Sequence, residues 1–218
     1  MATAAKRKLV LKMSVSLDGF VCGPNGEADW IFRTQGGDST AAVVETLRSA
    51  GVHIMGSRSY YDMAAFWPFS DLPFAPPMND IPKVIFSRTG LKDAARAETT
   101  RALADAKAHH TGKKPGVTPT AVVLKSWAEP IVASGDLAEE ILRLKEQPGN
   151  FILAHGGARF ARSLVATGLV DEYRLGIHPV VLGQGQALFS GLSSPVDLKL
   201  VSLTSYAAGV VGTVYQPA

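Results

Sequence analysis

The sequence predicts an α/β protein of three layers, with helices on both faces of a mostly parallel central sheet and an antiparallel hairpin at the C-terminus. Strand-like and helical segments alternate through most of the chain, and strands joined through helices usually pair in parallel. Near the C-terminus, only Ala207-Ala208-Gly209 separates two strand-like segments, which predicts antiparallel pairing. No linker with a shift in composition divides the chain, so we expect a single domain over residues 1–218.

Strands are predicted where short apolar or β-branched stretches end in turn-forming residues. The first covers Lys8 to Ser16, and the dipeptide Asp18-Gly19 then forms a turn. The other expected strands cover residues 20–22, 52–55, 83–87, 151–154, 171–181 and the two arms of 198–215. Residues 121–124 and 130–133 are further strand candidates.

The clearest helix covers residues 136–147. Asp136 can cap its first turn with Glu139 three residues on, and Gly149 follows its end. Further helices are expected at residues 40–50, 59–65, 94–108 and 158–167. Residues 66–82 hold five prolines and are predicted to form a loop, and residues 90–120 read as an insertion.

Composition excludes several classes of protein. The chain has 218 residues, 46% of them hydrophobic, and 22 Lys plus Arg against 19 Asp plus Glu. It is therefore neither disordered nor strongly charged, and scattered basic residues give no nucleic-acid footprint. No apolar run approaches the ~20 residues of a membrane span, and Cys22 is the only cysteine. We expect a soluble cytoplasmic protein in which Cys22 is a small buried side chain.

Several catalytic patterns are missing. The segment Gly112-Lys113-Lys114 lacks the remainder of a phosphate-binding P-loop, and no His-Glu-x-x-His motif, cysteine pair or Gly-x-Ser-x-Gly elbow occurs. The partial dinucleotide fingerprint Gly183-Gln184-Gly185 has Leu188 at its third glycine position. We therefore expect no metal site, no serine-hydrolase chemistry and no Rossmann dehydrogenase.

Three predicted strands end in residues that suit phosphate. The segments are Gly56-Ser57-Arg58, Ser87-Arg88-Thr89 and Gly156-Gly157-Ala158-Arg159. Arginine binds phosphate through two parallel hydrogen bonds, and glycines before a helix expose unpaired backbone N–H groups. In an open parallel sheet, ligands bind beyond the carboxyl ends of the strands. Together, the three ends predict a polyphosphate ligand, although each arginine alone could be a solvated charge.

Five blocks occur in an order that resembles a known family. They are Met13-Ser14-Val15-Ser16-Leu17-Asp18-Gly19-Phe20-Val21, Met55-Gly56-Ser57-Arg58-Ser59-Tyr60, Phe86-Ser87-Arg88-Thr89, Gly156-Gly157-Ala158, and Leu169-Val170-Asp171-Glu172-Tyr173 with His178 to Gly185. The chain resembles the dihydrofolate-reductase-like superfamily, in particular the C-terminal reductase domain of the bifunctional riboflavin-biosynthesis deaminase/reductase. The resemblance runs from about residue 8 to Pro217 and leaves out the insertion.

The resemblance implies a dihydrofolate-reductase-like fold and NADPH as cofactor. The residues that it assigns to the cofactor phosphates are Gly56, Ser57, Arg58, Ser87, Arg88, Thr89, Gly156, Gly157 and Ala158. The strand-end pattern adds Arg159 to the cofactor-binding candidates. It places Ser87, Arg88 and Thr89 near the adenosine 2′-phosphate. It also implies a homodimer.

The proton donor and the substrate contacts are less clearly marked. Asp29 and Trp30 stand where folate reductases keep a pocket acid and a tryptophan, although Asp29 could instead cap a short helix. Asp18 is a further candidate for substrate binding, with a turn residue as the alternative. Tyr60 and Trp67, with Phe66, could form an aromatic wall over a planar ring, or pack in the core. His155 and His178 are expected to be hydrogen-bonded core histidines.

The sequence thus predicts an NADPH-dependent oxidoreductase that acts on a small heterocyclic or carbonyl compound. By resemblance, the substrate is the 5-amino-6-(5-phosphoribosylamino)uracil of riboflavin biosynthesis. The chain lacks the zinc-binding signature of the deaminase. A dihydrofolate or pterin reductase is the alternative among enzymes, and a non-catalytic nucleotide-binding module is the alternative outside them.

Overall fold

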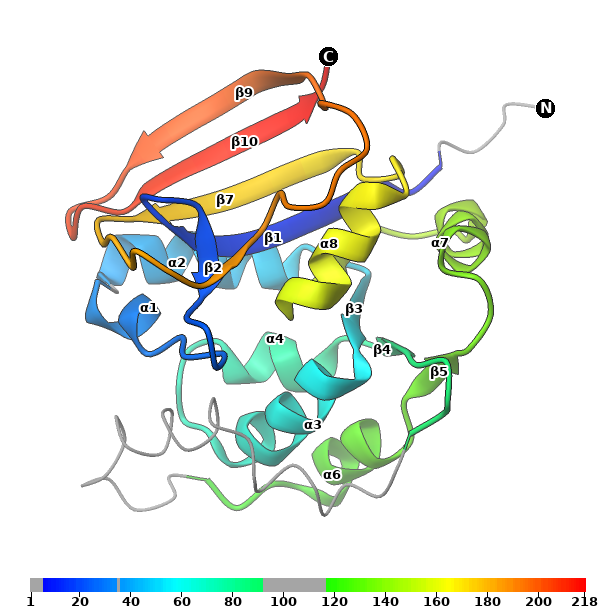
Figure 1. The fold of residues 1–218 in the computed structure, drawn as a ribbon. Coiled ribbons are helices and arrows are strands. Elements are labelled where there is room, and N and C mark those ends of the chain that lie inside the picture. The colour runs from blue at the N-terminus through cyan, green and yellow to red at the C-terminus, as the bar shows by residue number, and fades with distance from the viewer. Residues whose placement is uncertain (1–5, 35, 92–116) are drawn as a thin grey trace.

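Eight strands form one sheet that changes from parallel to antiparallel pairing toward the C-terminus (Figure 1). This computed structural model describes residues 6–34, 36–91 and 117–218. The strand order is β5 (Ile131–Ala133), β4 (Lys83–Phe86), β3 (Val52–Gly56), β6 (Ile152–Ala154), β1 (Leu9–Ser16), β7 (Glu172–His178), β10 (Val211–Pro217) and β9 (Leu198–Ser205). Neighbours from β5 to β7 are parallel, and β10 is antiparallel to both β7 and β9. The predicted mostly parallel sheet with an antiparallel C-terminal hairpin is confirmed.

Helices cover both faces of this sheet, as the sequence predicts. One apolar cluster joins the sheet to α7 (Leu137–Glu146) and α8 (Ala158–Ala166), and a second joins it to α2 (Gly37–Arg48), α3 (Ser57–Phe66), α4 (Ala75–Asp80) and α6 (Ala121–Ala128). Leu9 and Leu11 of β1 belong to the first cluster and Val10 to the second, because successive side chains of a strand point to opposite faces.

Shorter elements complete the fold. These are α1 (Trp30–Arg33), the 3₁₀ turn η1 (Trp67–Phe69), and a two-stranded sheet of β2 (Phe20–Cys22) and β8 (Gln186–Ala187). In Figure 1, β2 lies beside β1 at one end of the main sheet. The chain continues from β2 into α1.

Two predictions of secondary structure were wrong. Residues 121–124 form the start of helix α6 and not a strand. Thr120 Oγ1 caps this helix by accepting a hydrogen bond from Val123 N, and the Trp127 side chain of the helix is buried. Residues 66–82 are not a plain loop, because η1 and α4 lie within them. Prolines occupy the first turn of α4, where a missing N–H removes no helical hydrogen bond.

The parallel strands set the place of the site. Their carboxyl ends lie at one edge of the sheet, so the segments that follow β3, β4 and β6 meet there. The predicted helix 94–108 and most of the predicted insertion at residues 90–120 lie outside the described residues, whereas residues 130–133 contain the predicted strand β5.

Candidate functional site

A large cavity opens at the carboxyl edge of the parallel strands. Its volume is about 1290 Å³, and α1, α2, α3 and α8 contribute to its walls. Small-molecule sites usually measure ~300–1,000 Å³. The cavity is therefore large enough for an extended dinucleotide with a second small molecule beside it.

The three predicted phosphate-binding segments meet at this cavity. All ten residues that the sequence assigns to the cofactor line it: Gly56, Ser57, Arg58, Ser87, Arg88, Thr89, Gly156, Gly157, Ala158 and Arg159. Arg58, Arg88 and Arg159 are exposed, and none forms an ion pair with a described residue. Arg162 of α8 lines the same part of the cavity. Four guanidinium groups make this part, here called the cationic part, suitable for phosphates.

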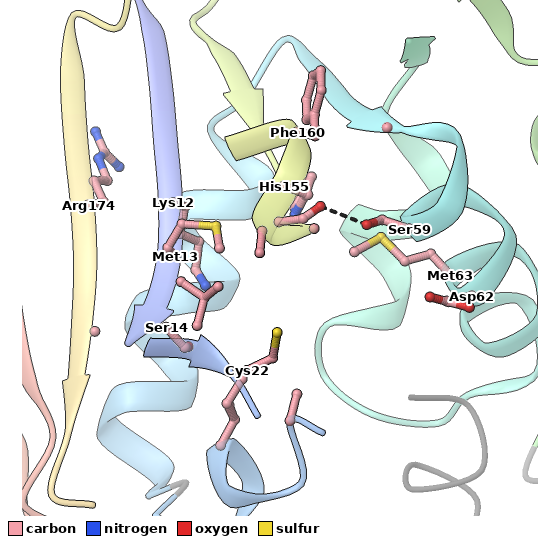
Figure 2. Close-up of a pocket in the computed structure, with 18 of the residues that line it drawn as sticks. Lys12, Met13, Ser14, Cys22, Ser59, Asp62, Met63, His155, Phe160 and Arg174 are labelled. Atoms are coloured by element: carbon pink, nitrogen blue, oxygen red, sulfur yellow. Dashed lines mark hydrogen bonds between the residues drawn. The ribbon is translucent and has the colours of Figure 1, made fainter. Parts of the chain in front are cut away.

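The turn into α8 has no room for side chains. Gly157 has φ +101°, and a Cβ there would lie 2.5 Å from Ser59 Oγ; a Cβ on Gly156 would lie 3.1 Å from Met13 Cε. Ser59 Oγ donates to the Gly156 carbonyl at 2.8 Å, which ties α3 to the turn (Figure 2). No side chain caps α8 or α3, so the first N–H groups of both helices are available to an anion.

The floor of the cavity carries a lysine, Lys12. It lies half-buried in the middle of β1, and its side chain forms no ion pair or hydrogen bond with the described residues. Burial lowers the pKa of Lys12 to about 8. Arg174 is its neighbour on β7, but the Arg174 Nε donates to Glu172 at 2.7 Å. Figure 2 shows Lys12 between Arg174 and His155, with Ser59 and Met63 of α3 across the cavity.

Two buried histidines also line the cavity. His178 Nδ1 lies 2.7 Å from Thr34 Oγ1, as expected for a hydrogen-bonded histidine. In contrast, His155 Nε2 is buried and has no hydrogen-bond partner in the part of the chain that the structure describes. The His155 ring contacts the His53 ring edge-on at 4.6 Å between centroids. Burial lowers the pKa of His178 to about 4 and that of His155 well below its usual value, with the Lys12 charge adding to both effects. Both rings are therefore neutral near pH 7.

His53 makes the fold sensitive to acid. Burial lowers its pKa from 6.5 to about 4, so the unfolded chain binds a proton in this pH range that the folded chain does not. We expect stability to fall by about 3 kcal/mol from this group as the pH drops from about 6.5 to about 4. Urea unfolding across this range measures the loss, and His53→Gln should reduce it. A pH-independent urea midpoint for the wild type would contradict the assignment.

The candidate substrate residues divide into two sets. Asp29 and Trp67 line the cavity, whereas Asp18, Trp30 and Tyr60 do not. Asp29 accepts from Arg33 Nη2 at 2.5 Å, a contact that must break or be shared before Asp29 can act on a substrate. Its side chain does not cap α1.

The other three residues support the walls. Asp18 accepts from Ser16 Oγ at 2.6 Å and from the Leu182 and Gly183 amides, which lowers the pKa of Asp18 and fixes the turn to the loop after β7. Trp30 is 3% exposed and meets the His178 ring edge-on. Tyr60 is 3% exposed, and its hydroxyl donates to the Trp127 carbonyl. The expected Tyr60 wall is thus part of the core, because Tyr60 lies on the face of α3 that packs on α6.

Sequence reasoning did not identify Lys12, Ser59 or Arg162. A signal for Lys12 exists, because it interrupts the apolar run Leu9-Val10-Leu11 and shares Val10's face of the strand. No comparable signal marks Ser59, whose role depends on a contact 97 residues away in sequence. Cys22 is half-buried and lines the cavity, where burial raises the pKa of its thiol.

The described residues contain neither a metal-binding cluster nor a membrane-spanning helix. Residues 6–34, 36–91 and 117–218 hold no cluster of three side chains able to bind a metal ion. Within the same ranges, no helix has the length and apolar character needed to cross a bilayer.

Comparison with known proteins identifies relatives over the whole fold. The family described as the RibD C-terminal domain matches residues 7–212. The uncharacterized protein YyaP of Bacillus subtilis (strain 168) is 30% identical over 210 residues, covering 96% of this chain and 95% of its own.

Solved structures share the fold at low identity. A pyrimidine reductase-like protein from Corynebacterium diphtheriae aligns with a TM-score of 0.62 and 16% identity, over 99% of this chain and 94% of its own. A second structure, from Thermotoga maritima, is that of a diaminohydroxyphosphoribosylaminopyrimidine deaminase/5-amino-6-(5-phosphoribosylamino)uracil reductase. It aligns with a TM-score of 0.62 and 16% identity, over 98% of this chain but only 57% of its own. Dihydrofolate reductase from Enterococcus faecalis, complexed with NADP(H), aligns with a TM-score of 0.55 and 12% identity, over 96% of each chain. The fold is that of the dihydrofolate reductases.

Proposed function

This chain belongs to the RibD C-terminal domain family, and we propose that it is an NADPH-dependent reductase of a small heterocyclic or carbonyl compound. Membership in a family of reductases supports an oxidoreductase. The observation that carries the proposal is the convergence of Arg58, Arg88 and Arg159 with two helix N-termini on one cavity. Such a set of donors binds polyphosphates.

The residues present fit NADPH. Gly156 and Gly157 line the cavity at the start of α8, which no side chain caps, so the unpaired N–H groups of this turn can bind a pyrophosphate. We assign the pyrophosphate to this turn and to the start of α3, with Arg58 and Arg159 beside it. We assign Ser87, Arg88 and Thr89 to the adenosine 2′-phosphate. When bound, NADPH supplies a hydride, and the chain's own residues place and polarise the acceptor.

Lys12 is suited to the acceptor. Its ammonium group is partly desolvated and has no partner among the described residues, so it can bind an oxygen or nitrogen on which negative charge develops. It can also donate a proton there, since its pKa is about 8. Asp29 is the second candidate for the proton transfer.

The role of Lys12 gives a pH prediction. Because its pKa is about 8, turnover that needs the ammonium form should fall as the pH rises above about 8. Lys12→Arg keeps the positive charge, so its alkaline limb should move to higher pH. The measurement is the pH profile of kcat for wild type, Lys12→Arg and the exposed control Lys125→Gln. Identical profiles for wild type and Lys12→Arg would remove Lys12 from the proton transfer.

The first test is turnover. Oxidation of NADPH and of NADH is followed by absorbance with 5-amino-6-(5-phosphoribosylamino)uracil and with dihydrofolate. The first compound is the substrate in the name of the Thermotoga maritima relative, and the second follows from the fold likeness to dihydrofolate reductase. We expect NADPH to be preferred. Tight NADPH binding without turnover on any compound would favour a nucleotide-binding module, and absence of NADPH binding would reject the proposed function.

A further inference from the structure

The cavity has a second part whose chemistry differs from that of the cationic part. It lies between β1, α1, α2 and the α3–α4 segment, and we call it the apolar part. Aliphatic, aromatic and thioether side chains form much of its lining, namely Ile31, Phe32, Val43, Leu47, Met63, Phe66, Trp67, Phe74 and Met78. The same segments add the polar side chains of Thr34, Ser39, Thr40 and Asp62. The apolar side chains come from α1, α2, α3, η1 and α4 and from Phe74 just before α4, so the apolar character extends around the walls. A ligand here gains most of its affinity by burying apolar surface.

The cations in the apolar part are already neutralised, with one exception. Arg174 donates to Glu172 at 2.7 Å and to Thr46 Oγ1 at 3.4 Å, and its guanidinium lies over the Phe151 ring. Lys12 is the only cation lining this part for which the described residues provide no partner.

Helix α2, which borders the apolar part, offers no anion site at its N-terminus. Asp38 stands in the first turn of α2, and its carboxylate accepts from the Ser39 amide and from the Ala207 amide, each at 2.8 Å. These bonds lower the pKa of Asp38 and place a negative charge at the helix N-terminus. A phosphate approaching α2 would be repelled there.

The cationic part offers the contrast. It holds Arg58, Arg88, Arg159 and Arg162 together with two uncapped helix N-termini. A phosphate carries nearly two negative charges, and leaving the second one unpaired in a desolvated site is costly. The phosphate-binding capacity of the described cavity therefore lies almost entirely where the dinucleotide is placed.

We propose that the compound reduced by this protein is a phosphate-free, mainly apolar ring compound whose carbonyl oxygen binds to Lys12. The inference rests on the proposed function and narrows its substrate. Hydride from NADPH adds to a ring carbon conjugated with the carbonyl, and the displaced π electrons move to the oxygen. The oxygen takes a proton from the Lys12 ammonium, which water restores, while NADPH becomes NADP⁺.

Matched ligands test the substrate class directly. Calorimetric titration compares 5-amino-6-(5-phosphoribosylamino)uracil with the same riboside lacking phosphate, on both the free and the NADPH-loaded protein. 7,8-Dihydrobiopterin and isatin extend the series of phosphate-free rings that bear a carbonyl. We expect the riboside to bind at least about tenfold more tightly than its phosphorylated form. The phosphorylated form must remove its phosphate from water without gaining a matching cation, and the riboside avoids this cost.

Variants locate the binding group. Lys12→Gln should weaken the phosphate-free rings about tenfold, Lys12→Arg should retain most of the affinity, and Lys125→Gln should change nothing. Tighter binding of the phosphorylated compound to the NADPH-loaded protein, in which the cationic part is filled, or absence of binding by all three phosphate-free rings, would overturn the substrate class. Absence of NADPH binding alone would reject the proposed function. Binding of the phosphate-free rings to the free protein, and its loss in Lys12→Gln, would still decide whether Lys12 binds a phosphate-free ring.

Discussion

Replacing Arg88 with alanine should abolish most of the preference for NADPH over NADH. Arg88 follows β4, is exposed and lines the cavity without an ion-pair partner among the described residues. A charge-assisted hydrogen bond contributes ~1.5–3 kcal/mol, which corresponds to roughly 10- to 100-fold in affinity. NADH lacks the 2′-phosphate, so its affinity should not change.

The dissociation constants of both nucleotides, measured by fluorescence titration, test this expectation. Arg48→Ala is the matched control, because Arg48 is an exposed arginine at the end of α2 that does not line the cavity. Adding Arg58→Ala to Arg88→Ala should weaken both nucleotides, since we assign Arg58 to the pyrophosphate that they share. If Arg88→Ala weakens NADPH and NADH equally, Arg88 does not bind the 2′-phosphate.

Gly157→Ala should lower both stability and nucleotide affinity. Gly157 has φ +101°, where a side chain costs ~1–2 kcal/mol, and the new Cβ would meet Ser59 Oγ at 2.5 Å. Ser59 must then move, and its 2.8 Å hydrogen bond to the Gly156 carbonyl is lost. We expect the free energy of unfolding to fall by a further amount of about 1 kcal/mol and NADPH to bind at least about tenfold more weakly.

Gly168→Ala separates these effects. Gly168 also has a positive φ, +68°, but a Cβ there would meet no atom within 4 Å. This variant should therefore carry the conformational cost alone and bind NADPH normally. Thermal unfolding and nucleotide titration of both variants provide the comparison. Equal nucleotide affinity in the two variants would show that the turn into α8 does not contact the cofactor.

The fold could be predicted largely because its signals are local. Helix α7 was predictable from Asp136, whose side chain caps the Ala138 and Glu139 amides as expected. The helix α6 was not, since a four-residue apolar run such as Ala121–Leu124 suits a strand or a buried helix equally. Only tertiary packing of Trp127 against Tyr60 and Lys83 decides between them.

The site was predictable in part for a related reason. Residues at the ends of parallel strands share one edge whatever the details of packing, so the cationic part followed from the sequence order. The face of a helix that turns inward depends on its neighbours. That dependence is why Tyr60 lies in the core while Met63 and Trp67 reach the cavity. Pairing between β1 and β7 similarly places Lys12 beside Arg174, whose guanidinium already donates to Glu172.

A crystal structure with NADPH tests the central claim most directly. We expect the dinucleotide along the carboxyl edge of the parallel strands, with its pyrophosphate at Gly156 and Gly157 and its 2′-phosphate at Arg88. The nicotinamide should face the apolar part, within reach of Lys12. A nucleotide bound elsewhere, or an edge that rejects NADPH at saturating concentration, would contradict the account.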